Sequence, residues 1–384
     1  MSQLNVNAIR ASNGTGDAIS FTASDKTCTA NITNNLSNRN LIINGAMQVA
    51  QRGTSVAWAA NGYLTCDRWN HNINNSAGRW TAKQTADGPD GFRRCLELDV
   101  TTADTSIAAA EHALIQYKWE GQDVQQLAKG TAGAKKFTVS FYVKGNGNAT
   151  YMCEFYDRTN DRLTRQQFSV TSSWTRVTLT FDNETSNGTL NDDNSHELDM
   201  MIWLHAGSDF TSGTYTANTW AAKTNANRAV GISSLFSSTD NYFKITGVQV
   251  EVGDYATDFE HRSYHDELLR CCRYYFKISP SAAEKPIVST AWGPFQNKAQ
   301  GTTFFPVEMR TEPTALEQSG TAGDYQVSHG SSGGDCNAVP VFNQASKFAA
   351  TTTFERSGTP WSQGDAIQPS PKNSSGFLAW SSEL

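Results

Sequence analysis

Four aromatic residues stand out as positions where this chain could bind a ligand. Trp80, Tyr215 and Trp220 lie in or near polar segments rich in glycine and asparagine, and Trp203 occupies the less apolar parity of an alternating run. The C–H face of a sugar stacks well on a Trp or Tyr ring, and these rings lose little conformational entropy on binding. The four residues are therefore candidate glycan contacts, and packing in a core or at a subunit interface is the alternative.

Two groups of residues share some features with a metal site. Residues 182–194 form an oxygen-rich run that could hold calcium, but the ligand spacing of a calcium-binding loop is missing, so a solvated turn is the prediction. His261 and His265 have the i, i+4 spacing of helical metal ligands. No Glu follows His261, however, and Glu260 with Arg262 predicts a salt-bridged joint instead. We therefore expect no metal site.

The sequence contains no catalytic motif. It lacks a nucleophile elbow, a phosphate-binding loop and a dinucleotide fingerprint. The chain has 37 Asp and Glu residues, so pairs such as Asp157 with Asp161, or Asp192 with Asp193, say nothing about glycoside hydrolysis without a measured separation. We expect a protein that is not an enzyme and that needs no cofactor.

Charge and composition exclude several classes of partner. The formal net charge is −6, the pI is about 5.7, and no Lys/Arg cluster resembles a nucleic-acid-binding patch. The first residues lack a charged region followed by an apolar core, and no run reaches membrane-spanning length, so we expect synthesis in the cytoplasm and no membrane insertion. Seven cysteines without paired spacing predict free, mostly buried thiols, and a vicinal disulfide between Cys271 and Cys272 would be strained.

The elements that position the candidate residues are predicted to be β-strands. Gly145-Asn-Gly147 predicts a hairpin turn that leads into a strand over residues 151–156. Residues 111–128 could be helical, but Gly121 interrupts them, and strand, turn and short helix is the alternative. The absence of an internal repeat favours two packed sheets over a propeller, a solenoid or a long β-helix. Alternation of apolar and polar residues predicts half-buried antiparallel strands over residues 94–100, 137–143, 177–181 and 198–204.

A closing strand over residues 242–252 carries a change of phase. Apolar residues occupy odd positions up to Ile245 and even positions from Val248, and this slip at Gly247 is typical of a β-bulge. Residues 266–276 then predict a short helix that joins the first β domain to a second one.

The residues after 278 return to β patterns. Residues 303–309 predict a strand that Pro306 places at the edge of a sheet. Residues 328–334 predict a Gly- and Ser-rich loop. The final run, residues 376–384, alternates to its end, so we expect it to pair within a sheet. Short strands are also predicted near residues 339–342 and 348–354.

Residues 1–36 form a polar arm that is too thin to build a core. Alternating apolar residues from Val6 and from Ile19, on either side of the Asn13-Gly14 turn signal, predict one or two short strands. Such a segment becomes ordered by lying on another chain, so we expect it to be a docking segment.

Three long motifs carry a resemblance to a known family. They are Asn-Leu-Ile-Ile-Asn-Gly at residues 40–45, Asp-Arg-Trp at 67–69, and Gln-Val-Glu-Val-Gly-Asp-Tyr-Ala-Thr-Asp-Phe-Glu-His-Arg at 249–262. Together with residues 304–313 and 377–384, they resemble bacteriophage tail-fibre and related virion proteins over most of the chain. The resemblance implies a jelly-roll module, similar to carbohydrate-binding domains, between the first and third motifs, and a small β domain after it.

The expected fold is therefore all-β. It comprises an extended N-terminal arm, a jelly-roll β-sandwich, a short linker helix and a small C-terminal β-sandwich. These parts are expected at residues 1–36, 37–263, 264–277 and 278–384, in that order.

The resemblance also implies a function. It points to a structural virion protein of a tailed bacteriophage, most simply a homotrimeric tail fibre on the outside of the particle. Residues 1–36 would bind other virion proteins, and the chain would attach the particle to a glycan on the host cell surface. Two alternatives remain open, namely a head-decorating or connector protein that binds no glycan, and a tailspike that degrades polysaccharide.

Overall fold

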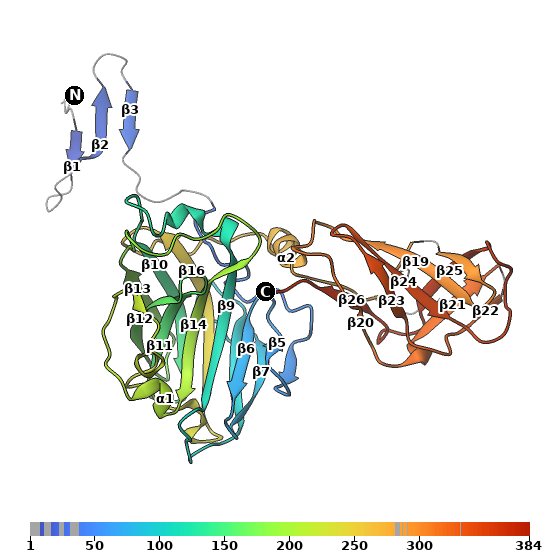
Figure 1. Ribbon diagram of the computed structural model, residues 1–384, viewed down its shortest axis with the longest axis horizontal. Coiled ribbons are helices and arrows are strands. Elements are labelled where there is room, and N and C mark those ends of the chain that lie inside the picture. The colour runs from blue at the N-terminus through green and yellow to red at the C-terminus, as the bar shows by residue number, and fades with distance from the viewer. Residues whose placement is uncertain are drawn as a thin grey trace.

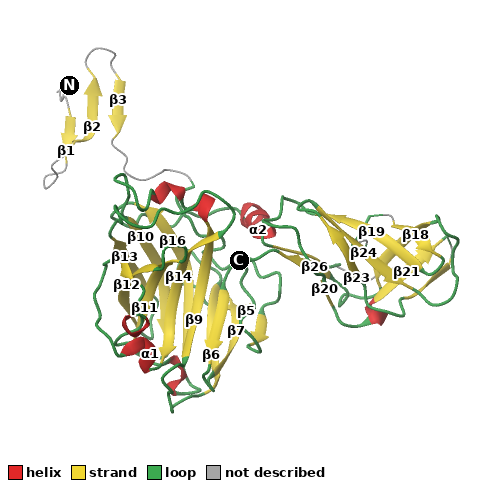
Figure 2. Ribbon diagram, in the orientation of Figure 1, coloured by secondary structure: helices red, strands yellow, loops and turns green. Residues whose placement is uncertain are grey.

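The computed structural model describes residues 38–280, 285, 287–289, 291–330 and 332–384, together with the backbone of three short strands within residues 8–30. The chain is built almost entirely from antiparallel β-strands, which confirms the predicted all-β class (Figures 1 and 2). In Figure 1 one large group of strands lies to the left of α2 and a second group lies to its right. Within the described residues, every helix is too short or too polar to cross a membrane.

Two antiparallel sheets face each other in the first sandwich. A six-stranded sheet has the order β13-β10-β16-β8-β7-β4, and a seven-stranded sheet has the order β15-β12-β11-β14-β9-β6-β5. Their facing sides enclose one continuous core, because each strand turns alternate apolar residues inward. The first sheet consists of β4 (Ser55–Ala57), β7 (Arg79–Thr85), β8 (Cys95–Thr102), β10 (Phe137–Gly145), β13 (Thr175–Phe181) and β16 (Tyr242–Val252). The second consists of β5 (Gly62–Tyr63), β6 (Asn70–Asn74), β9 (His112–Glu120), β11 (Ala149–Asp157), β12 (Arg162–Val170), β14 (His196–Ala206) and β15 (Ala221–Ala222).

The hairpin predicted at Gly145-Asn-Gly147 is wrong. β10 pairs with β13 and β16, whereas β11 pairs with β12 and β14, so the turn carries the chain across the core from one sheet to the other. Phe137 of β10 and Phe155 of β11 meet across that core with ring centroids 4.7 Å apart. Strands that face each other and strands that pair both alternate with period two, so the pattern could not distinguish the two arrangements.

The bulge predicted at Gly247 is confirmed. The register of β16 against β10 shifts between Ser140 and Tyr142, and Gly247 has a φ of 63°. The extra residue allows Ile245 and Val248 both to face the core.

Residues 111–128 follow the second of the two predicted alternatives. β9 ends at Glu120, and two short 3₁₀ helices, η1 (Gly121–Asp123) and η2 (Gln125–Leu127), come directly after it.

The second group of strands begins after α2 (Tyr264–Cys272). Ser263 caps this helix by accepting a hydrogen bond from the N–H of Asp266. A three-stranded sheet, β17-β26-β20, and a seven-stranded sheet, β22-β21-β25-β18-β19-β24-β23, surround a second core. The strands predicted near 339–342, 348–354 and 376–384 are confirmed as β23, β24 and β26. The elements are β17 (Tyr275–Ile278), β18 (Ala291–Phe295), β19 (Lys298–Phe304), β20 (Glu317–Gln318), η5 (Ala322–Asp324), β21 (Tyr325–His329), β22 (Ser332–Asp335), β23 (Val341–Ala345), β24 (Ala349–Glu355), β25 (Ala366–Pro371) and β26 (Leu378–Ser381).

Two downstream predictions are wrong. β19 ends at Phe304, before Pro306, because proline has no N–H to donate to a strand partner. Residues 328–334 were predicted to be a loop, but most of them belong to the hairpin of β21 and β22, in which Ser328 pairs with Gly333. Glycine has no side chain to reveal a period of two, so the pattern was invisible there.

The N-terminal strands pair among themselves. β1 (Ala8–Arg10), β2 (Asp17–Thr22) and β3 (Thr27–Ala30) form an antiparallel sheet in the order β1-β2-β3. The structure thus has three strands where one or two were predicted. Val6 and the Asn13-Gly14 turn lie outside the described residues.

The end of the chain returns to the first sandwich. Lys118 of β9 donates a 2.6 Å hydrogen bond to the carbonyl of Leu384, and Arg310 donates to the carbonyl of Asn194 at 3.1 Å. The carboxylate of Glu383 forms an ion pair with Arg68. These contacts join the two groups of strands at the point where the label C stands in Figure 1.

Candidate functional site

Two of the four candidate aromatic residues are buried, Trp80 in the core between the sheets and Trp203 on the other side of the seven-stranded sheet. Trp80 of β7 is fully buried and packs against Phe236, with ring centroids 5.4 Å apart. Trp203 of β14 is buried beneath Arg228, whose guanidinium carbon lies 4.8 Å from the centroid of the indole. Neither indole presents a ring face to solvent, so a sugar on the surface could not stack on it.

The other two candidates are half-buried and already have partners. The hydroxyl of Tyr215 accepts a 3.0 Å hydrogen bond from the N–H of Gln167. The indole N–H of Trp220 donates to the carbonyl of Asp182 at 2.9 Å, and the ammonium of Lys129 lies 4.7 Å from the ring centroid. Only part of each ring therefore remains free for a ligand.

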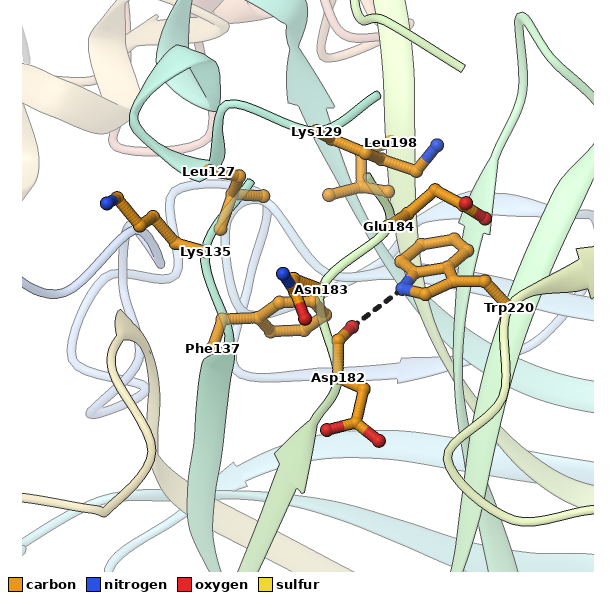
Figure 3. A pocket seen from close by; sticks show the side chains of 9 residues that line it. All are labelled: Leu127, Lys129, Lys135, Phe137, Asp182, Asn183, Glu184, Leu198 and Trp220. Atoms are coloured by element: carbon orange, nitrogen blue, oxygen red, sulfur yellow. Dashed lines mark hydrogen bonds between the residues drawn. The ribbon is translucent and has the colours of Figure 1, made fainter. Parts of the chain in front are cut away.

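Trp220 also lines the hollow shown in Figure 3. The indole ring forms one wall, and its N–H points to the carbonyl of Asp182. The enclosed volume is about 10 Å³, which suits one water molecule and not a sugar ring. The hollow is lined by Leu127, Lys129, Lys135, Phe137, Asp182, Asn183, Glu184, Leu198 and Trp220.

The carboxylates around this hollow are held by separate cations. Glu184 pairs with Arg162 at 2.6 Å and Asp182 pairs with Lys136 at 2.7 Å. Both acids belong to residues 182–194, the run that was weighed as a calcium loop. Because their charges are balanced by different side chains, the solvated turn describes this segment better.

The predicted joint at Glu260 and Arg262 is confirmed by an ion pair of 3.3 Å. His261 precedes α2 and packs against Phe92, with ring centroids 5.1 Å apart, whereas His265 is exposed on the helix. The two histidines therefore do not share one helical face.

Residues 207–233 form a cover segment over the outer face of the seven-stranded sheet. They include α1 (Ser208–Thr211) and η3 (Asn225–Asn227), and they enclose a small apolar cluster that contains Trp203. Within the sheet Trp203 lies between Leu114 of β9 and Met152 of β11. A broad sheet face that could otherwise have been a ligand-binding surface is thus covered by the chain itself.

One buried ion pair secures the cover segment. The Nε atom of Arg228 lies 3.1 Å from each carboxylate oxygen of Glu154, which is fully buried on β11. A second, more exposed pair joins Lys223 to Asp161 at 2.7 Å. The hydrogen bond from Lys223 lowers the pKa of Asp161 below its usual value.

The described surface has one sheet face where a large aromatic residue stands among uncharged polar groups. One cross-strand row runs over β18, β19, β24 and β23, and two of its members, Trp292 and Val341, are 52% and 58% exposed. The members of the row, in order, are Trp292, Gln300, Thr353 and Val341. We call the outer side of these four strands the Trp292 face.

The rest of the Trp292 face carries further uncharged polar side chains, one exposed phenylalanine and one ion pair. A neighbouring row contains Thr302, Thr351 and Gln344, and Phe304 lies beyond it at 71% exposure. Lys298 and Glu355 form an ion pair of 3.7 Å at the margin. An indole among hydroxyl and amide groups suits a neutral polyhydroxyl ligand, and exposed Phe and Val suit a protein neighbour.

The Trp292 face was not predicted, although the sequence of its strands contains a signal. Ala291, Gly293, Ala299 and Gly301 are small residues on the buried parity of β18 and β19, which left Trp292 on the opposite parity. A Trp on the outward parity of a strand with small inward residues marks an exposed ring.

Comparisons with known proteins give low similarity. No protein-family model and no curated protein matches the chain. A structure titled CBM4 structure and function is 12% identical, covering 55% of this chain and 98% of its own, with a TM-score of 0.28. A CBM61 module in complex with β-1,4-galactotriose is 8% identical over 56% of this chain and 100% of its own, with a TM-score of 0.29. A xylan-binding CBM22 domain from Paenibacillus barcinonensis is 10% identical over 54% and 99%, with a TM-score of 0.26. Similarity this low assigns no ligand to this chain.

Proposed function

We propose that this chain is an external virion protein of a tailed bacteriophage, most simply a tail fibre, and that it attaches the particle to a glycan on the host cell. The motifs at residues 40–45, 67–69 and 249–262 support the family. The Trp292 face supports the activity, and it is the observation on which the proposal rests.

The chemistry of the Trp292 face fits a neutral sugar. The exposed indole of Trp292 offers an apolar plane, and Gln300, Thr353 and Thr302 offer hydrogen-bond donors and acceptors on the same side of the sheet. Strand backbones hold these side chains in fixed positions, which reduces the entropy lost on binding.

Attachment in this proposal relies on several copies of the chain. Residues 1–36 dock on other virion proteins, and three subunits associate, so that three Trp292 faces act together. One shallow face binds a sugar weakly, but linked copies raise the effective concentration and therefore the avidity.

A structural protein without glycan binding is the second candidate. Phe304, Val341 and Phe348 are exposed on or beside the Trp292 face, and apolar side chains of this kind are typical of contacts with a neighbouring protein. A polysaccharide-degrading activity has less support, because Asp157 is bound by Lys129 and Asp161 by Lys223.

The test is binding of the purified full chain to a glycan array and to cells of tailed-phage hosts, with the mass measured in the same preparation. Trp292→Ala should lower sugar binding about tenfold or more, since one well-stacked ring contributes a large share of a weak interaction. Tyr264→Ala is the matched control, because Tyr264 is 56% exposed on α2 and away from the face.

The outcomes separate the two candidates. Sugar-competed binding by a trimer that is lost in Trp292→Ala supports the attachment protein. A folded oligomer that binds no sugar, and that dissociates when Phe304 is replaced by Ser, favours the structural protein. Sugar binding that Trp292→Ala leaves unchanged would remove the Trp292 face from the proposal.

A further inference from the structure

Three side chains that can bind a metal meet at one end of the first sandwich. Asp104 follows β8, Glu111 directly precedes β9, and His205 lies near the end of β14. One ligand atom from each residue lies within 4.8 Å of the others, and all three residues are buried. Asp104 and Glu111 flank one loop, but His205 comes 94 residues after Glu111, so sequence spacing does not reveal the group.

His205 is oriented as a metal-binding histidine would be. Its Nδ1 atom lies 2.8 Å from the hydroxyl of Ser234, and its Nε2 atom lies 3.3 Å from the carboxylate of Glu111. A hydrogen bond at one ring nitrogen fixes the ring and directs the other nitrogen toward the ligand group, which is the usual arrangement around a bound metal.

The negative charge of the group is not balanced by a cationic side chain. Asp104 accepts hydrogen bonds from the hydroxyl of Ser76 at 2.8 Å and from the N–H of Ala77 at 2.7 Å. Among the described residues, neither Asp104 nor Glu111 forms an ion pair with Lys or Arg. Two buried carboxylates cost free energy unless a cation accompanies them, and a divalent ion between them would supply that charge.

We propose that Asp104, Glu111 and His205 bind one divalent transition-metal ion, and that Zn²⁺ fits best. One imidazole nitrogen and two carboxylate oxygens form a donor set that zinc accepts from three protein ligands, with water in the remaining position. Ca²⁺ prefers a larger number of oxygen ligands, and Mg²⁺ prefers oxygen alone.

The ion has a structural role in this proposal. It fastens β14 to the loop between β8 and β9, and through Ser234 it also fixes the residues just before η4 (Leu235–Ser237). The role is independent of the attachment function, because the site lies in the first sandwich and the Trp292 face lies on the second group of strands.

The first experiment titrates Zn²⁺ into the full chain after removal of metals with a chelator. We expect one Zn²⁺ per chain by calorimetry and elemental analysis, and a rise in Tm of several degrees at about hundredfold excess over Kd. Mn²⁺ should bind more weakly, and Ca²⁺ should leave the Tm unchanged. His205→Gln and Glu111→Gln should each weaken zinc binding about tenfold or more.

His196→Gln is the matched control. His196 is also on β14 and also contacts a carboxylate, that of Asp199, but within the described part of the chain it has no third ligand beside it. This variant should keep the zinc affinity of the unchanged protein.

A second measurement needs no variant. X-ray absorption of the zinc-loaded protein should show nitrogen and oxygen ligands with one imidazole, and Co²⁺ should give visible absorption bands of low coordination number. Sulfur ligation, zinc binding that survives in both glutamine variants, or an absence of saturable binding would overturn the proposal. In the last case the group is a hydrogen-bonded pair of Glu111 and His205 with Asp104 beside it.

Discussion

Arg68 and Glu383 are separated by 315 residues in the sequence and form a buried ion pair. The guanidinium carbon of Arg68 also lies 3.4 Å from the ring centroid of Tyr274. Arg68 belongs to the Asp-Arg-Trp motif and Glu383 to the final run of the chain, so the pair connects two of the segments that carry the family resemblance. Through Arg68, the Asp-Arg-Trp motif therefore helps to hold the two groups of strands together.

Replacement of Glu383 by Gln should destabilise the protein by about 3–5 kcal/mol, because it leaves the charge of Arg68 buried without a carboxylate. Chemical unfolding followed by fluorescence measures this. Glu308→Gln is the control, since Glu308 is 48% exposed and pairs with Lys347 at 3.3 Å, and its loss should cost less than about 1 kcal/mol. Equal effects of the two variants would contradict a special role for the buried pair.

His71 should make the protein sensitive to acid. Burial lowers the pKa of His71 from 6.5 to about 3, and the side chain packs edge-on against Trp80. Below pH 6.5 the unfolded chain therefore takes up a proton that the folded chain refuses, so stability falls by about 1.4 kcal/mol for each pH unit down to about pH 3.

The variant His71→Leu removes the imidazole that takes up this proton in the unfolded chain. Between pH 7 and pH 4.5 its stability should fall by about 2–3 kcal/mol less than that of the unchanged protein. His265→Gln, at an exposed position on α2, should leave the profile as it is. Identical pH profiles for His71→Leu and the unchanged protein would show that His71 is not the responsible group.

Gly247→Ala should destabilise the first sandwich by about 1–3 kcal/mol. The backbone there has a φ of 63°, and an added Cβ would lie 2.7 Å from the ring of Phe92. Gly147→Ala is the control, since nothing lies within 4 Å of its added Cβ. Thermal unfolding distinguishes the two variants, and a Gly247→Ala protein as stable as the control would mean that the bulge tolerates a side chain.

Arg228→Ala should loosen the cover segment. It leaves the buried carboxylate of Glu154 with a hydrogen bond from the indole N–H of Trp203 but without its ion-pair partner. This loss should cost about 3–5 kcal/mol, and residues 207–233 should exchange amide hydrogens faster and become open to proteases. Lys223→Ala removes the exposed pair on the same segment and should change little.

A double variant tests the cause of this effect. Arg228→Met combined with Glu154→Met removes both charges and should restore much of the stability. If it is no more stable than Arg228→Ala, packing and not charge holds the segment.

The sequence predicted the positions of the strands better than it predicted which strands pair with one another. The slip of parity at Gly247 was a local pattern that reappears in the structure, and the final run pairs within a sheet as predicted, although its strand covers only Leu378–Ser381. The turn at Gly145-Asn-Gly147 failed, because the choice between a paired strand and a facing strand depends on tertiary packing across the core.

The candidate site was harder to predict for a related reason. Trp203 does lie on the outward parity of β14, as the alternation indicated, but the chain folds back over it. That cover depends on Arg228 meeting Glu154, a contact between residues that are 74 positions apart. Trp292 was not among the predicted contacts, although the small residues on the opposite parity of β18 mark its ring as exposed.

The pair of Arg68 and Glu383 also has a consequence for synthesis of the protein. A ribosome that adds about 5–20 residues each second reaches Glu383 roughly 15–60 s after Arg68. Until then Arg68 lacks the carboxylate with which it pairs at the junction. The ion pair can therefore form only after residue 383 has been made, and ribosome stalling before that residue would leave Arg68 without its carboxylate at the junction.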